Sequence, residues 1–312
     1  MSNDSNLDLS SLEENSSNSG LHIAILVGIT ALVFFFLFRQ IDIVNVVFLL
    51  KNISCVHWVL ASTLTLSFFV IIAVRWRIVL LSMGFHISLR ESCVIILGVW
   101  PISTISPSKS GDLLRAISLR KKIKPMVVAG SVLTERMLDF LMIAVFALMG
   151  GLLFRRFDII SIASAVIFCV VVSVWITGKN IRIPFGQKVG VQLENLLQSI
   201  RMLRKQPVLL TAIVLLTILK WVAVFAQAAI LFRGVGATVP FGFIMAALPI
   251  SILAGLLPIT LGGMGVRESA MVVLFHGVAT ESQSLAVGLL YSFFGYWLLA
   301  ILGIPFIKKA LT

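Results

Sequence analysis

Long apolar runs with few charges limit what this chain can fold into. A helix that crosses about 30 Å of hydrocarbon needs about 20 mostly apolar residues. Six stretches meet this requirement: 21–38, 56–74, 132–154, 159–178, 208–232 and 284–307. The runs follow one another so closely that no separate soluble core fits between them. We therefore predict an all-α polytopic fold, with one membrane domain over residues 21–312.

The first twenty residues differ from the rest in composition. They are rich in Ser, Asn and acidic residues and contain too few apolar side chains to pack. They also lack the basic start and the cleavage site of a signal peptide. We predict a disordered N-terminal tail over residues 1–20, followed by a retained first span.

Two other apolar segments fit a single span poorly. Segment 93–105 has only thirteen residues before Pro107 and a polar stretch. Segment 241–275 is too long and is interrupted by Pro249, Pro258 and several glycines. Such segments are tolerated at membrane depth only where protein or water covers the freed backbone groups. We predict that both are broken or re-entrant helices.

The basic residues predict an orientation. The net charge of +12 could suggest nucleic acid, but no soluble basic fold is predicted that would present such a face. With both termini cytoplasmic, fifteen of the 25 Lys and Arg residues lie in inner loops, five in outer loops and five at membrane depth. The inner set is Arg75, Arg77, Arg90, Arg120, Lys121, Lys122, Lys124, Lys179, Arg182, Lys188, Arg201, Arg204, Lys205, Lys308 and Lys309. We expect a multi-pass protein of the cell inner membrane.

The same layout predicts an inverted repeat. Residues 56–154 and 208–307 each contain a span, a broken segment and a second span, in opposite orientations. Pro107-x3-Gly111-x3-Arg115 in the first half is echoed by Pro258-x4-Gly263-x3-Arg267 in the second. Paired, interrupted segments of this kind point to a transporter's binding site. Between the halves, residues 186–205 fit either an amphipathic helix on the cytoplasmic leaflet or a plain charged connector.

Nine ionisable side chains are predicted at membrane depth, where each costs at least about 2.5–3.5 kcal/mol. They are Lys109, Asp112, Arg115, Glu135, Arg136, Asp139, Lys220, Arg267 and Glu268. Arg115 and Arg267 each follow a Gly-containing break, so helix N-terminal amides and a guanidinium would lie at one depth. This arrangement suits a phosphate or a carboxylate.

The other charged residues have two interpretations. Glu135, Arg136 and Asp139 lie within one helical turn of each other, and they fit substrate binding and an internal salt-bridge network equally well. Lys109 would add a point charge to the site. For Lys220 we favour a snorkelling or anchoring role. Gly263 and Gly265 would allow a tight bend or a close helix approach.

No motif for a cofactor stands out. The LGGMGVRE stretch lacks the Lys-Ser/Thr ending of a nucleotide loop, and the three cysteines lack metal-ligand spacing. We therefore predict no cofactor, no metal and no enzymatic activity.

Three motifs in order resemble one membrane family. PSKSGDLLRA (107–116), VLTERMLDFL (132–141) and LPITLGGMGVRESA (257–270) are similar to motifs in the transmembrane region of lysylphosphatidylglycerol synthase, a flippase-like family. The resemblance implies substrate-binding roles for the matching residues, namely Lys109, Gly111, Asp112, Arg115, Glu135, Arg136, Asp139, Gly263, Gly265, Arg267 and Glu268. Ser108 and Asp112 stand where the family often has Gly and Glu. The soluble transfer domain of the synthases does not occur in this sequence, so we do not expect lysyl-lipid synthesis.

Two functions follow as hypotheses. The first is a flippase or transporter that moves an anionic or polyprenyl-linked lipid through a central cationic site, in which Arg115 and Arg267 bind the head group. The second is a membrane enzyme or accessory subunit in polyprenyl-phosphate sugar or envelope glycan assembly. Membrane lipids are the expected partners. The sequence leaves a homo-oligomer and a glycosyltransferase partner open, and no nucleic-acid partner is expected.

Overall fold

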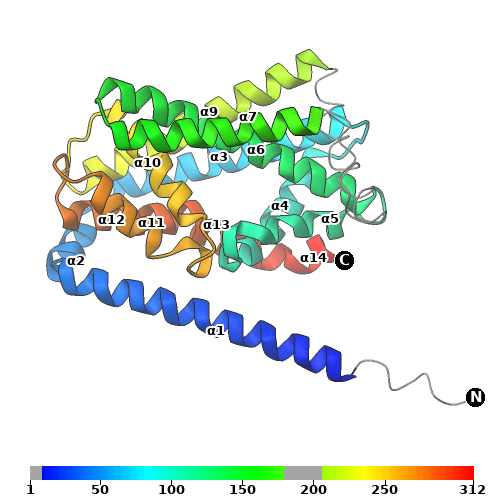
Figure 1. The fold of residues 1–312 in the computed structure, drawn as a ribbon, viewed down its shortest axis with the longest axis horizontal. Helices are drawn as coiled ribbons and strands as arrows, with labels where there is room; N and C mark the ends of the chain where they lie inside the picture. Colours follow the sequence, from blue (N-terminus) through cyan, green and yellow to red (C-terminus); the bar gives the residue numbers. More distant parts are fainter. Residues whose placement is uncertain (1–8, 179–205) are drawn as a thin grey trace, which may run out of the picture.

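The computed structural model describes residues 9–178 and 206–312, and within these ranges the chain is a helical bundle (Figure 1). Three helices are each long and apolar enough to cross a membrane: α3 (Cys55–Ser82), α6 (Pro125–Leu153) and α9 (Pro207–Gly234). A fourth crossing, Glu281–Leu311, consists of α12 (Glu281–Ser292), a π-helical turn (Phe293–Trp297), α13 (Leu298–Gly303), a 3-10 turn (Ile304–Phe306) and α14 (Ile307–Leu311). The predicted all-α polytopic fold is confirmed.

The N-terminal part forms a bent pair of helices. Helix α1 (Leu9–Gln40) meets α2 (Ile43–Lys51) at 92°, and the Asp42 side chain accepts a hydrogen bond from the Asn45 amide to cap α2. Because α1 begins at Leu9, the structure differs from the predicted tail over residues 9–20. Extending an existing helix by one residue is easy compared with nucleating a new one. Residues 1–8 lie outside the described part.

Both broken segments return to the end of the bundle from which they enter (Figure 1). The first consists of α4 (Leu89–Ile105), a 3-10 segment η1 (Pro107–Leu114) and α5 (Arg115–Ser118). Lys122 after this segment forms a 2.7 Å ion pair with Glu91 at its start. The prediction of a break here is confirmed, and the two ends of the segment lie at the same end of the bundle.

The second broken segment has the same plan. It consists of α10 (Phe241–Gly255), a short turn η2 (Leu261–Gly263) and α11 (Val266–Leu274). The Gln283 side chain, just after the segment, donates to the carbonyl of Val235 just before it, at 3.2 Å. Thr280 and Gln283 also form a capping box that starts α12, so the chain turns back into the bundle at a defined residue.

The two halves pack reciprocally. Helices α3 and α9, the first of each half, lie against each other; α4 packs on α13 and α14, α10 packs on α6, and η1 packs on η2. Small residues allow this, because a Cβ on Gly150 would lie 2.7 Å from the Ala246 backbone and one on Gly98 would overlap the Phe306 carbonyl. A two-fold relation between halves would give this pattern, although their inverted orientation stays a prediction.

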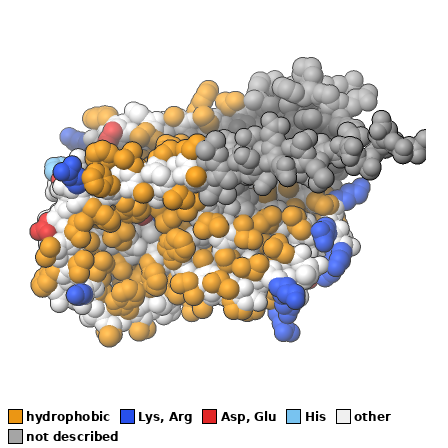
Figure 2. All heavy atoms as spheres, turned by 90° about the horizontal axis from the view of Figure 1, so that it is seen from below, with side chains coloured by type: hydrophobic (Ala, Val, Ile, Leu, Met, Phe, Trp, Pro, Cys, Tyr) orange, Lys and Arg blue, Asp and Glu red, His pale blue; other side chains and the backbone are white. Residues whose placement is uncertain are grey.

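The surface and the remaining helix agree with a membrane location. Helix α7 (Phe157–Gly178) follows α6 and packs on it. Figure 2 shows hydrophobic side chains over the middle of the visible face and Lys and Arg toward its two ends. Residues 179–205, which include the predicted amphipathic helix 186–205, lie outside the described residues. The start of α1 and the end of α14 lie at the same end of the bundle (Figure 1).

Candidate functional site

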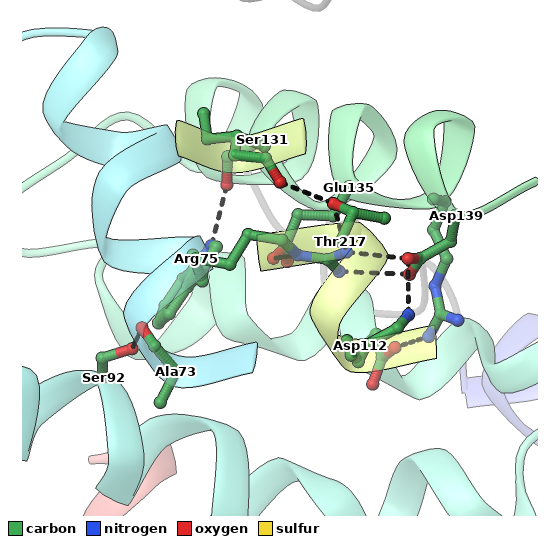
Figure 3. A network of polar contacts seen from close by, with 12 residues as sticks. Ala73, Arg75, Ser92, Asp112, Ser131, Glu135, Asp139 and Thr217 are labelled. Carbon is green, nitrogen blue, oxygen red and sulfur yellow. Dashed lines mark hydrogen bonds and ion pairs between the residues drawn. The ribbon is translucent and has the colours of Figure 1, made fainter. Parts of the chain in front are cut away.

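Arg75 is the centre of a buried ionic network that joins α3, α6 and α9 (Figure 3). Its guanidinium extends from α3 toward two carboxylates on α6. Nε donates to Glu135 Oε1 at 3.0 Å, while Nη1 and Nη2 donate to Asp139 Oδ1 and Oδ2 at 2.7 and 3.1 Å. Nη1 also donates to the Thr217 hydroxyl at 3.2 Å. Only 2% of Arg75 is exposed, so its placement in an inner loop was wrong.

Lys220 belongs to the same network. Its Nζ lies 2.5 Å from Asp139 Oδ1, and the Trp221 indole nitrogen donates to that oxygen at 3.2 Å. Lys220 is 6% exposed and points inward from α9, so the snorkelling interpretation was wrong. The sequence did contain a signal, because a Lys in the middle of a long apolar run is expensive unless it has a partner.

The first broken segment joins the network from the other side. Arg115 Nη1 donates to Glu135 Oε2 at 2.9 Å, and Nη2 lies 3.8 Å from Asp112 Oδ1. Arg136 pairs with Asp112 rather than with Asp139, which had been within its expected reach. Glu135 therefore accepts from two arginines, so that the network connects α3, α5 and α6. Glu135, Arg136 and Asp139 thus form the salt-bridge network that was one of their two interpretations.

The second broken segment has its own ion pair. Arg267 Nη2 lies 3.1 Å from Glu268 Oε1 and donates to the Ser292 hydroxyl at 2.6 Å. Ser292 also donates to Glu268. The other Glu268 oxygen accepts from the Gly265 amide at 2.6 Å, which caps α11. Arg267 is 1% exposed, and its Nε and Nη1 have no hydrogen-bond partner among the described residues.

Glycines make the two breaks. Gly263 has φ +74°, and a Cβ there would overlap the Gly255 carbonyl. Gly265 has φ +82°, and its Cβ would lie 2.8 Å from Val33 of α1. A Cβ on Gly111 would lie 2.7 Å from the Ser103 backbone. Both predicted roles, the tight bend and the close approach, are therefore found in the structure.

Lys109 is only partly buried, and it differs from the buried cations because its side chain contacts aromatic rings alone among the described residues. Its Nζ lies 3.9 Å from the centre of the Tyr296 ring and 5.0 Å from that of Trp100, which are cation–π distances. Among the described residues it forms no ion pair. Lys109 and its neighbour Ser108 both have left-handed backbones, with φ +56° and +52°, a conformation that is uncommon outside glycine.

A cavity of about 110 Å³ lies between these groups. Five cationic side chains and three acidic ones line it: Arg75, Lys109, Arg115, Arg136, Lys220, Asp112, Glu135 and Asp139. Apolar and aromatic side chains from α3, α4, α6, α9, α10 and the last span complete the wall. Each water needs about 10–15 Å³ of such volume, so the cavity has room for a small polar group.

The structure brings most of the predicted site residues together. Lys109, Asp112, Arg115, Glu135, Arg136 and Asp139 all line the cavity. Arg267 lies behind the cavity wall, 4.1 and 5.8 Å from the ring centres of Tyr296 and Tyr291. Arg75, Lys220 and the two tyrosines were missed by sequence reasoning. Nothing in a single sequence distinguishes Tyr291 and Tyr296 from residues that anchor a span at the interface.

Most of the chain is similar to one known family of membrane proteins. The model of the lysylphosphatidylglycerol synthase transmembrane region matches residues 22–303. The chain belongs to this family. The match includes both broken segments and the whole buried network, which confirms the resemblance seen in the three motifs.

The chain is also similar to a curated protein of comparable length. It is described as "UPF0104 membrane protein" from Methanothermobacter thermautotrophicus and is 22% identical over 291 residues, which cover 82% of this chain and 86% of the relative. The chain is thus similar to a membrane protein over most of both lengths.

Two departures from the family motifs can be understood from the structure. Ser108 occupies a left-handed position that glycine adopts without strain, and its hydroxyl donates to the Leu256 carbonyl across the two breaks at 2.7 Å. Asp112 still reaches both Arg136 and Arg115. The shorter carboxylate of this chain is therefore long enough to pair with two arginines.

Proposed function

We propose that this protein is a flippase or transporter that moves an anionic or polyprenyl-linked lipid between the leaflets of the membrane. The family is flippase-like, and the proposal extends that description to a head-group class and a site. In this account the protein is a carrier rather than an enzyme, because the lipid is moved without a covalent step.

The observation that carries the proposal is the charge of the cavity. Five cationic and three acidic side chains line it, at a depth where a charge is expensive unless it is used or paired. Lys109 is the cation with aromatic partners only, among the described residues. An anionic head group would compensate this excess charge while its tails remained outside the cavity.

The paired breaks also support transport. Two re-entrant segments meet at their tips, where Ser108 of η1 donates to Leu256 after α10. Paired, interrupted helices near the midplane are the usual place for a transporter site. A cavity of about 110 Å³ is too small for a whole lipid, so translocation requires the surrounding helices to separate during the cycle.

Translocation in proteoliposomes tests the proposal. The full chain is reconstituted with fluorescent anionic, cationic or polyprenyl-phosphate lipids, and the fraction moved between leaflets is followed with an impermeant quencher. We expect protein-dependent movement of an anionic class and none of the cationic lipid. Equal rates with and without protein for every class, with folded protein confirmed, would refute the proposal.

A further inference from the structure

Arg267 is a buried cation whose hydrogen bonds are incomplete. Its Nη2 donates to Glu268 and Ser292, whereas its Nε and Nη1 have no hydrogen-bond partner among the described residues. A guanidinium stays charged in proteins and carries five N–H donors. Leaving such donors unsatisfied at 1% exposure is unfavourable, which indicates a ligand that completes them.

Tyr296 lies within reach of two cations from different broken segments. The Lys109 Nζ is 3.9 Å from its ring centre and the Arg267 guanidinium carbon is 4.1 Å from it. Lys109 and Tyr296 line the cavity, whereas Arg267 does not. The Tyr296 ring therefore contacts one cation that lines the cavity and a second cation that does not.

The local backbone around this contact is irregular on both sides. Tyr296 lies in the π-helical turn Phe293–Trp297, and such turns often occur at functional sites. Lys109 lies in the left-handed pair of η1, which costs energy unless the surroundings fix it. These two irregularities bring the amine and the ring together.

We propose that Lys109 and Arg267 together bind one phosphate group of a lipid, and that the Tyr296 ring moves aside to admit it. The proposal rests on the proposed function and names the head-group chemistry. A tetrahedral phosphate with up to two charges can reach a point charge and a guanidinium on separate elements. Arg115 is held by carboxylates to a greater extent, because its Nη1 donates to Glu135 and its Nη2 lies 3.8 Å from Asp112, although its Nε has no hydrogen-bond partner among the described residues.

Lipid binding by the purified full chain tests this. Native mass spectrometry measures retention of phosphatidic acid, of diacylglycerol with the same tails, and of a fatty acid as the carboxylate probe. We expect wild type to retain phosphatidic acid at least about tenfold better than the other two. Lys109→Gln and Arg267→Gln should each remove most of this preference, whereas Lys308→Gln at the exposed C-terminal end should keep it. Equal retention of phosphatidic acid and fatty acid would overturn the assignment.

Two Tyr296 variants test the moving ring. Tyr296→Phe keeps the ring and should bind as wild type does. Tyr296→Ala removes the ring and should raise phosphatidic acid binding severalfold. Weaker binding would contradict the proposal that the ring must move aside. If Arg267→Gln does not fold, Lys109→Gln and Tyr296→Ala still decide the outcome.

Competition and transport measurements separate a lipid phosphate from the free ion, and binding from translocation. Inorganic phosphate that competes as strongly as phosphatidic acid would assign the site to the free ion and overturn the lipid assignment. Binding that depends on Lys109 and Arg267 in a protein without translocation would support the phosphate site while refuting the proposed function. Translocation by a protein whose lipid binding does not depend on Lys109 or Arg267 would support the proposed function and refute the phosphate site.

Discussion

Arg75 and Asp139 form a two-point ion pair across α3 and α6, with N–O distances of 2.7 and 3.1 Å. Both residues are buried, so each neutralises a charge that lipid or protein could not solvate. Because Glu135 and Lys220 contact the same pair, the network holds three helices of both halves together.

Arg75→Leu should destabilise the protein strongly. It leaves Asp139 and Glu135 with fewer cations, and removing one partner of a buried pair costs about 3–5 kcal/mol. The measurement is the apparent melting temperature in detergent, monitored as the loss of the monodisperse peak in size-exclusion chromatography. Arg233→Leu, which removes an exposed cation at the end of α9, is the matched control. Equal melting temperatures for the two variants would contradict the network's role.

Lys220 and Asp139 should be energetically coupled. Lys220→Met removes one of the two cations that pair with Asp139, and Asp139→Asn leaves the Lys220 charge without its carboxylate, whereas the double variant removes both charges of this pair. We expect the two single losses to exceed the loss in the double variant by about 0.5–3 kcal/mol. The double-mutant cycle on melting temperature checks this, and simple additivity would show that the 2.5 Å contact contributes nothing.

Gly263→Ala should disrupt the second break. Alanine at φ +74° costs about 1–2 kcal/mol from the left-handed backbone alone, and its Cβ would also overlap the Gly255 carbonyl. Gly277→Ala is the control, because its φ is +84° with nothing within 4 Å of the new Cβ. Both variants carry the backbone cost, so the difference in melting temperature measures the overlap. No difference would mean that the tip of the break is loosely packed.

If both broken segments are re-entrant, the loops that flank each of them share one side of the membrane. In a variant with Cys55, Cys93 and Cys169 replaced by alanine, single cysteines at Arg90 and Arg120 should react with an impermeant maleimide from the same side of oriented vesicles. A cysteine at Arg233 should react from the other side. Labelling of positions 90 and 120 from opposite sides would show that the first broken segment crosses fully.

Much of the fold could be predicted from the sequence, because a membrane span requires a long apolar run and a break requires Pro or Gly at a particular place. Pro107 and the glycines at 262, 263 and 265 marked both breaks. The site was harder. Arg75 lies near the end of its apolar run, so it looked like an interfacial residue, and only the packing of α3 on α6 and α9 shows that it is buried.

Partners in the ionic network were equally hard to predict. Spacing along α6 put Arg136 within reach of Asp139. In the structure, however, Arg136 pairs with Asp112 of η1, and Asp139 pairs with Arg75. Local sequence separation cannot rank partners that come from other helices. The aromatic environment of Lys109 depends in the same way on the last span, almost 190 residues further along the chain.

The initial rate of lipid translocation in Lys109→Gln beside Lys308→Gln tests the central claim most directly. Lys109 forms no ion pair among the described residues, so its replacement leaves no carboxylate without a partner and should change the melting temperature little. We predict that Lys109→Gln lowers the rate for a phosphate-bearing lipid at least about tenfold while Lys308→Gln matches wild type. Wild-type rates in both folded variants would contradict a cationic site at the centre of the transport path.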